Sequence, residues 1–269
     1  RFGHGLSLNG AGDIVAIGDI HGCAQCLQDT LKENGIVNDY GDWIAGNKTV
    51  VQLGDIIGRG SDDPQVIHNI QRLMSQAESA GGKWVQLLGN HEYMELNSDF
   101  RYANDGPNSG FGSTEKRRAA FQPRGSEGNW LRSLPVIHKQ DGIVFVHGGL
   151  SDLNIAKLCL DLLTSNPEYR DLYRDLYRDL YRDLILNHIL WDRTLSLGNE
   201  RDICPRLDKV LDIMSSKKLV VGHTITEQAG FEPGEIGQRC DGKLILVDVG
   251  MSDAFPNIPK YNRALHIYN

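Results

Sequence analysis

Five short apolar stretches of the sequence each end at a polar residue whose side chain can bind a metal ion. These residues are Asp19, Asp55, Asn90, His147 and His223, and His21 lies two positions beyond Asp19. Hard and borderline divalent ions accept carboxylate, amide and imidazole groups together. A lone acidic residue after a strand is more often a helix cap, but caps do not account for six such residues after five strands. The pattern therefore predicts a metal centre.

The predicted centre has the groups that hydrolysis of a phosphate ester requires. Two divalent ions about 3.5–4 Å apart activate the water between them and offset the negative charge of the transition state. We assign Asp19 and His21 to the first ion and Asp55 to the bridge between the two ions. The ligands of the second ion are then Asn90, His147 and His223. The sequence thus predicts a dinuclear phosphoesterase that attacks its substrate with a metal-bridging hydroxide.

Three further residues have the chemistry that such an enzyme needs. His91 directly follows Asn90 and cannot easily share its metal, so we assign it as the general acid that protonates the leaving oxygen. The alternative is a histidine that only orients the site. Arg59, four residues after Asp55, is a substrate-binding candidate because a guanidinium binds phosphate bidentately. Arg193 is a second such candidate, with a surface salt bridge as the alternative.

The elements that must position these residues follow from the apolar stretches. Continuous β-branched stretches of this length are typical of strands buried on both faces. Helical patterns fall between the early stretches, around residues 23–34 and 64–80, and the alternation of strand and helix predicts an α/β fold. In such sheets, ligands collect beyond the carboxyl ends of the strands. A sixth stretch, Leu244–Val247, ends at Asp248 in the same way.

Residues 97–128 interrupt this alternation. They are rich in Gly, Ser, Asn and Pro and then carry the basic residues Lys116, Arg117 and Arg118. We expect a long surface excursion over the site rather than a linker between domains. The whole chain, residues 1–269, is therefore expected to form a single domain.

The sequence Tyr-Arg-Asp-Leu occurs four times in succession within residues 169–184. A four-residue period nearly matches the helical one, and Asp and Arg three positions apart stabilise a helix. We expect a projecting helix at about residues 168–190. The repeat is either a tandem expansion without a role or a docking surface for a protein partner.

Composition excludes several classes of protein. The net charge of the 269-residue chain is −7 and no long basic cluster offsets it, which argues against a nucleic-acid partner. No apolar run approaches the roughly 20 residues that span a bilayer, so we expect no membrane insertion. The chain begins at Arg1 rather than Met, so we expect a processed or truncated protein whose targeting segment can have been removed. The cytoplasm is the favoured location.

The five cysteines are an odd and sparse set, which does not indicate a disulfide framework. Cys23 and Cys26 form a Cys-x-x-Cys pair without the second half of a zinc site. We expect two packed thiols on the first turn of a helix. The alternative is a regulatory disulfide.

Five motifs occur in a fixed order along nearly the whole chain. They are Gly-Asp-Ile-His-Gly at 18–22, Gly-Asp-Ile-Ile-Gly-Arg-Gly at 54–60, Gly-Asn-His-Glu at 89–92, His-Gly-Gly at 147–149 and Gly-His at 222–223. As a set they resemble the phosphoprotein phosphatase branch of the calcineurin-like metallophosphoesterases. Trp-Asp-Arg at 191–193 and the segment 248–252 are similar to the Shewanella-like protein phosphatases. The resemblance implies a central β-sandwich flanked by helices, two divalent metal ions of Mn or Fe/Zn type, and removal of phosphate from Ser, Thr or Tyr side chains.

One position departs from the family's pattern. Family members usually have Gly-Asp-x-x-Asp-Arg-Gly, and the second Asp, which steadies the general-acid histidine, is Gly58 in this chain. The resemblance therefore predicts reduced activity on poor leaving groups and a gain from Gly58→Asp. Asp62, Asp63 and Asp192 are candidates to replace the missing carboxylate.

Two other functions remain open at this point. Dinucleoside polyphosphate hydrolases share the same ligand motifs, so diadenosine tetraphosphate is an alternative substrate to a phosphoprotein. A metal-stabilised scaffold without catalysis, which binds a partner through residues 169–184, is the second alternative. The complete set of six ligands argues against the scaffold.

Overall fold

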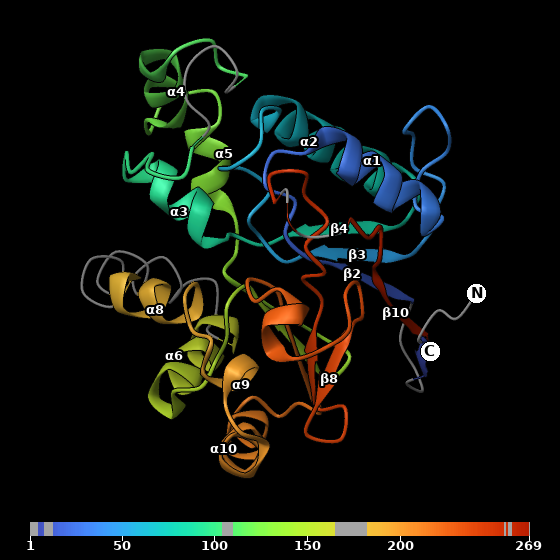
Figure 1. The fold of residues 1–269 in the computed structure, drawn as a ribbon, viewed down its shortest axis with the longest axis vertical. Coiled ribbons are helices and arrows are strands. Elements are labelled where there is room, and N and C mark those ends of the chain that lie inside the picture. Colours follow the sequence, from blue (N-terminus) through green and yellow to red (C-terminus); the bar gives the residue numbers. More distant parts are fainter. Residues whose placement is uncertain are drawn as a thin grey trace.

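Two sheets form the centre of the fold in the computed structural model, which describes residues 5–7, 13–103, 110–164, 182–255, 257 and 260–268 (Figure 1). The first sheet has the order β1 (Gly5–Ser7), β10 (Leu265–Tyr268), β2 (Ile14–Ile17), β3 (Thr49–Gln52) and β4 (Lys83–Gln86). The second has the order β5 (Ile137–Gln140), β6 (Ile143–Val146), β7 (Lys218–Val221), β9 (Leu244–Leu246) and β8 (Gly237–Arg239). Strands β2, β3 and β4 are parallel, and so are β6, β7 and β9. The carboxyl ends of parallel strands lie at one edge of a sheet, where the predicted ligands follow.

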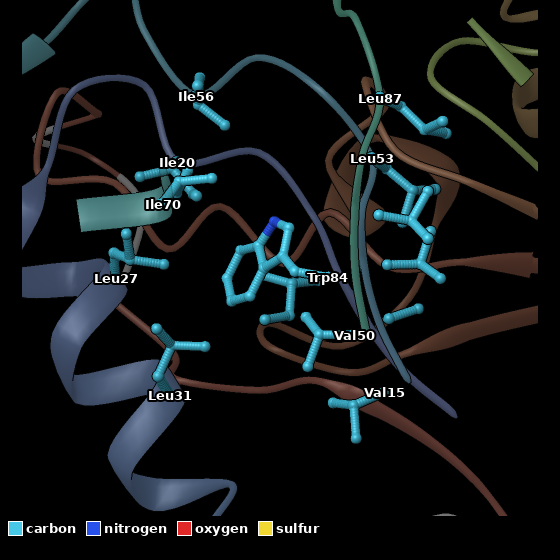
Figure 2. Close-up of a cluster of buried hydrophobic side chains, with 14 of the residues drawn as sticks. Val15, Ile20, Leu27, Leu31, Val50, Leu53, Ile56, Ile70, Trp84 and Leu87 are labelled. Atoms are coloured by element: carbon cyan, nitrogen blue, oxygen red, sulfur yellow. The ribbon is translucent and has the colours of Figure 1, made fainter. Parts of the chain in front are cut away.

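Two helices pack on one face of the first sheet. They are α1 (Ala24–Glu33) and α2 (Asp63–Ser79), and they confirm the helices expected around residues 23–34 and 64–80. One cross-strand row on this face consists of Val15, Val50 and Trp84. Leu27 and Leu31 of α1 point toward this row (Figure 2). The apolar face of the helix is thereby removed from water, which is the main source of stability for a helix of this length.

The second sheet packs on the first with one face and on helices with the other. Phe145 and Val220 belong to the same core cluster as the first sheet. Their chain neighbours Val144 and Leu219 belong to a second cluster, together with residues of the flanking helices. These helices are α6 (Leu153–Thr164), α8 (Arg182–Ile189) and α10 (Glu200–Ile213). Because side chains alternate between the two faces of a strand, the layers run helix, sheet, sheet, helix, and the predicted α/β sandwich is confirmed.

The remaining elements lie in loops around this sandwich. They are α3 (Asn90–Leu96), α4 (Thr114–Phe121), α5 (Gly128–Ser133), α9 (Thr194–Leu197) and the 3₁₀ helix η2 (Thr226–Ala229). Helices α3, α4 and α5 pack on one another. Figure 1 shows them at one end of the first sheet, to the side of α2.

The excursion expected at residues 97–128 is only partly a surface feature. It carries α4, and Arg117 of this helix is 2% exposed. Buried carboxylates of Asp63 and Glu95 bind this side chain, so the excursion packs against the rest of the protein at this point.

The Tyr-Arg-Asp-Leu repeat falls largely outside the described residues. Of the helix expected at about 168–190, the structure describes α8 and the residues that follow it. The docking role expected for residues 169–184 stays a prediction from the sequence.

Two disulfides correct the expectation for the cysteines. Cys23 is bonded to Cys26 on the first turn of α1, so the pair is not two free thiols. Cys204 of α10 is bonded to Cys240, which follows β8, with 5.4 Å between their Cα atoms. A separation of 36 residues left no local signal for this second bond. Cys159 is a buried free thiol.

None of the helices in the described ranges combines the length and the apolar character that a bilayer crossing needs.

Candidate metal centre and active site

Six polar residues converge where the strands of both sheets end. Asp19 and His21 follow β2, Asp55 follows β3, Asn90 begins α3 after β4, His147 follows β6 and His223 follows β7. All six side chains are buried. The first sheet thus contributes four of the residues and the second sheet contributes two, so the cluster lies where the two sheets meet.

Three of the six hold an unusual backbone conformation. The φ angles of His21, Asp55 and His223 are 49°, 52° and 62°, in the left-handed region that most side chains avoid. Such a conformation costs of order 1–3 kcal/mol and persists only where the surroundings enforce it. It occurs here at sharp turns that direct the side chains back toward one point.

Gln52, the last residue of β3, connects two of these turns. Its side-chain nitrogen donates to the carbonyl oxygens of Gly18 and Gly54 at 2.9 and 2.8 Å, and its oxygen accepts from the Gly54 N–H at 2.8 Å. Gly18 and Gly54 directly precede Asp19 and Asp55. The buried amide therefore fixes the distance between the two acidic residues.

Glu92 fastens the loop after β3 to helix α3. One carboxylate oxygen accepts from the N–H groups of Gly89 and Asp55 at 2.7 and 2.8 Å. The other accepts from Ile56 and Ile57 at 2.9 and 3.2 Å. Four donors to one buried carboxylate hold Asp55 against the helix that begins with Asn90.

The donor atoms lie close enough to share metal ions. One ligand atom from each of Asp19, Asp55, His147 and His223 lies within 4.8 Å of the others, and the same holds for His21, Asp55 and His91. Asp55 belongs to both groups. Ligand atoms in adjacent positions on one ion, each bonded at about 2.0–2.2 Å, lie about 3 Å apart.

His147 and His223 offer nitrogen atoms suited to such an ion. The Nε2 of His147 lies 2.8 Å from Asn90 Oδ1 and 3.4 Å from Asp55 Oδ2. Its Nδ1 donates to the carbonyl of Leu53 at 2.8 Å, which leaves Nε2 facing the cluster. The Nε2 of His223 is buried and lacks a hydrogen-bond partner among the described residues. A metal ion would satisfy this atom, so the donor set fits the metal site that the sequence predicts.

The charges of the cluster are unbalanced without a cation. Burial and the neighbouring Asp248 raise the pKa of Asp19 well above its usual value, and burial raises the pKa of Asp248 to about 6. Burial alone would lower the pKa of His147, but the carboxylates of Asp55 and Asp19 outweigh it and raise that pKa to about 10. Burial lowers the pKa of His21 to about 3, so this imidazole is neutral, the form that binds metal.

His91 lies beside the cluster and against Gly58. Its Nε2 is 3.9 Å from Asp55 Oδ2, and its ring centroid is 4.6 Å from that of His21. A Cβ atom on Gly58 would lie 2.3 Å from His91 Nδ1, so the ring packs on bare backbone where a side chain would collide. The position of this glycine explains why the ring can approach the loop so closely.

Of the three carboxylates suggested as replacements for the missing Asp, Asp62 and Asp192 are engaged elsewhere. Asp62 accepts from the Ser61 hydroxyl at 3.1 Å. Asp192 accepts from the N–H groups of Ser151 and Thr194 at 2.8 and 2.9 Å. Asp63 is the one that comes near, because its Oδ1 accepts from the Gly58 N–H at 3.0 Å.

A cavity of about 170 Å³ opens above the cluster, and both predicted substrate-binding arginines line it. The Arg59 guanidinium lies between two aromatic rings, 4.7 Å from the centroid of Tyr102 and 5.3 Å from that of Phe255. Arg193 donates to Gln228 Oε1 at 3.1 Å. Two cations therefore face the same space in which the metal ligands end.

Comparison with known proteins connects this geometry to a family. A sequence model of the calcineurin-like phosphoesterases matches residues 12–227. The chain belongs to the calcineurin-like phosphoesterase family. Shewanella-like protein phosphatase 1 from Plasmodium berghei is 30% identical over 250 residues, which cover 90% of this chain and 67% of that protein. The crystal structure of a cold-active protein-tyrosine phosphatase from a psychrophilic Shewanella species superposes with a TM-score of 0.72 at 28% identity, covering 90% of this chain and 72% of that one.

A more limited likeness extends to another group of hydrolases. Symmetrical bis(5'-nucleosyl)-tetraphosphatase from Nitrosococcus oceani is 29% identical over 170 residues, which cover 59% of this chain and 53% of that protein. The likeness to the Shewanella-like phosphatases is longer. The predicted family, fold and enzyme class are confirmed, and this calcineurin-like phosphoesterase is a metal-dependent protein phosphatase.

Several residues that build the site of this phosphatase were missed in the sequence. Asp248 was noted at the end of the sixth apolar stretch but was not assigned a role, and it lines the cavity. Gln52 ends the buried strand β3 and Glu92 lies in the first turn of α3, and neither position was assigned a role from the sequence. Tyr102 and Phe255 come from loops whose path the sequence does not disclose.

Proposed function

We propose that this phosphatase holds two divalent cations, of Mn or Fe/Zn type. Asp19 and His21 would bind one, Asn90, His147 and His223 the other, and Asp55 both. The observation that carries the proposal is that Asp55 has a ligand atom within 4.8 Å of those of His147 and His223 and also of His21, whose Nε2 lies 3.7 Å from Asp19 Oδ2. When bound, such a pair of cations supplies an activated water and positive charge for the phosphoryl oxygens.

The remaining roles follow from the residues around the cavity. Arg59 and Arg193 would bind the phosphoryl oxygens, since both line the cavity and a guanidinium matches phosphate geometry. His91 would donate a proton to the leaving oxygen, because its ring lies between the cluster and the cavity.

The shape and lining of the cavity favour phosphotyrosine as the substrate. The metal-binding side chains are buried, whereas Tyr102 and Trp191 at the mouth are 41% and 39% exposed. A phenyl ring gains contact with aromatic side chains such as these. A phosphoserine side chain is shorter and offers no ring for these contacts.

The test compares substrates and metal content together. We expect purified enzyme with Mn²⁺ to hydrolyse a phosphotyrosine peptide faster than the same peptide with phosphoserine, and faster than diadenosine tetraphosphate. Asp55→Asn should lower turnover at least about 100-fold and lower the bound metal, because it weakens both sites. Asp208→Asn, an exposed residue paired with Lys243, is the matched control.

The outcomes separate the alternatives. Fastest turnover of diadenosine tetraphosphate would support the polyphosphate hydrolase instead. Full metal content and full activity in Asp55→Asn would overturn the assignment of the bridging ligand. Absence of turnover on every substrate in metal-loaded protein would support the scaffold.

A further inference from the structure

Arg117 is a buried arginine that joins two carboxylates behind the active site. Its Nη2 donates to Asp63 Oδ2 at 2.7 Å and to Glu95 Oε1 at 2.6 Å, and its Nε donates to Glu95 Oε2 at 2.9 Å. The rings of Phe111 and Phe121 lie beside the guanidinium, 5.2 and 5.6 Å from its centre. Placing three charges out of water is costly, so the arrangement calls for an explanation beyond stability.

The first carboxylate connects Arg117 to the loop under the His91 ring. Asp63 binds Arg117 with one oxygen and accepts from the Gly58 N–H with the other, at 3.0 Å. Gly58 is the residue on whose backbone the His91 ring packs. Asp63 is fully buried, so this connection has few other conformations. The loop that limits the position of His91 Nδ1 is thereby fixed by Arg117.

The second carboxylate connects Arg117 to the helix that carries His91. Glu95 lies four residues after His91 on α3, one turn along the same face. Helix α3 has only 7 residues, and short helices depend on external contacts for their orientation. The two hydrogen bonds from Arg117 to Glu95 provide such a contact and fix the direction of the helix relative to the loop.

We propose that Arg117 is a positioning residue for His91. It fixes the position of the loop under the imidazole ring relative to the helix that carries the ring. Position 58 is a glycine and has no carboxylate that could orient the ring directly. Arg117 lies outside the lining of the described cavity, so it acts through His91 rather than on the substrate. The inference rests on the proposed role of His91 as the general acid.

The test uses two substrates that differ in how much they need a proton donor. Phenyl phosphate has a poorer leaving group than p-nitrophenyl phosphate, and the two are similar in shape. Arg117→Lys keeps the charge but cannot bind two carboxylates in the geometry of a guanidinium. We expect it to lower kcat for phenyl phosphate at least about 10-fold, with a change below about 3-fold for p-nitrophenyl phosphate, since general acids contribute about 10²–10⁴-fold. KM and bound metal should stay unchanged.

Three further variants make the result specific. Arg118→Met, the adjacent residue of α4 whose guanidinium lies over Phe100, is the matched control and should change neither substrate. If Arg117→Lys does not fold, Asp63→Asn replaces it, because it keeps an oxygen for the Gly58 N–H and loses the ion pair. The double variant His91→Ala/Arg117→Lys should have the same ratio of kcat for phenyl phosphate to kcat for p-nitrophenyl phosphate as His91→Ala alone.

A spectroscopic measurement tests the positioning without catalysis. In metal-free protein, the ring C–H resonance of His91, assigned through His91→Ala, should move in Arg117→Lys and not in Arg118→Met. The ring of His266, which is bound to Asn34, serves as the internal reference.

The outcomes distinguish this inference from the proposed function. An equal loss on both substrates in Arg117→Lys, or an unmoved His91 resonance, would overturn the positioning role while the general acid stands. If His91→Ala itself leaves the ratio of the two kcat values unchanged, the general-acid role fails and the inference falls with it.

Discussion

Gly58 determines how closely the loop after β3 approaches the His91 ring. Its φ angle is +107°, and a Cβ atom there would lie 2.3 Å from His91 Nδ1. The resemblance to the family suggested that Gly58→Asp would restore a missing carboxylate and raise activity on poor leaving groups. The structure gives the opposite expectation, because the new side chain needs the space that the imidazole occupies.

We therefore expect Gly58→Asp to impair the enzyme. Its kcat for phenyl phosphate should fall at least about 10-fold as His91 is displaced, and the free energy of unfolding should fall by about 1–3 kcal/mol from the strained backbone. Steady-state kinetics and chemical denaturation measure the two effects.

Gly46→Ala separates backbone strain from collision. Gly46 has a φ angle of +60° but open space around it, so its substitution should cost stability without changing kcat. A gain in kcat for phenyl phosphate in Gly58→Asp would contradict the steric argument.

At the scale of elements, the Cys204–Cys240 disulfide ties α10 to the second sheet. It closes a loop with a separation of 36 residues, whereas Cys23 and Cys26 are separated by 3. Loop-closure entropy then gives about 4 kcal/mol of stabilisation for the long loop and about 2 kcal/mol for the short one.

Replacing each pair by alanines checks this difference. We expect the Cys204→Ala/Cys240→Ala protein to lose about 2 kcal/mol more unfolding free energy than the Cys23→Ala/Cys26→Ala protein, in urea titrations of oxidised samples. Equal losses would show that chain entropy does not govern the effect. Disulfides are typical of proteins in oxidising compartments, so intact bonds in protein from its native source would argue against the cytoplasm.

The strands and helices could be predicted from the sequence more completely than the loops of the site. Val50 and Phe145 lie in apolar stretches that specify buried strands. The residues that follow these strands come together because the carboxyl ends of parallel strands lie at one edge of a sheet. Gln52 was hidden inside such a stretch, because its hydrogen bonds depend on a neighbouring strand. Tyr102 and Arg117 come from the excursion, where no periodicity fixes the path of the chain. Cys240 and Cys204 are 36 residues apart in the sequence and are brought together only by the packing of α10 on the second sheet.

At the scale of the whole molecule, the metal-binding residues lie where the two packed sheets meet, so their protonation bears on the stability of the whole fold. The metal-free protein should lose stability as the pH rises from 7 to 9. The pKa of His147 is raised to about 10, chiefly by the carboxylates of Asp55 and Asp19. The folded protein therefore binds a proton that the unfolded chain has released above about pH 6.5.

This proton costs about 1.4 kcal/mol of unfolding free energy per pH unit while it is bound only in the folded state. We expect a fall of about 1–3 kcal/mol between pH 7 and 9 in a chelator. Saturating Mn²⁺ should raise stability and flatten this dependence, because the cation takes the place of the proton at His147. Thermal unfolding in both conditions gives the comparison, and a flat or rising stability in the chelator would contradict the assignment of this proton.

The left-handed turns at His21, Asp55 and His223 position side chains for catalysis but lower the stability of the fold. Glycine relaxes such a turn, and at His223 it also removes an imidazole nitrogen without a partner among the described residues. A laboratory selection for thermal stability alone would therefore favour these glycine substitutions, and the selected variants would lose activity. Directed evolution of this protein should therefore select for turnover together with stability. Otherwise the most stable variants will be inactive.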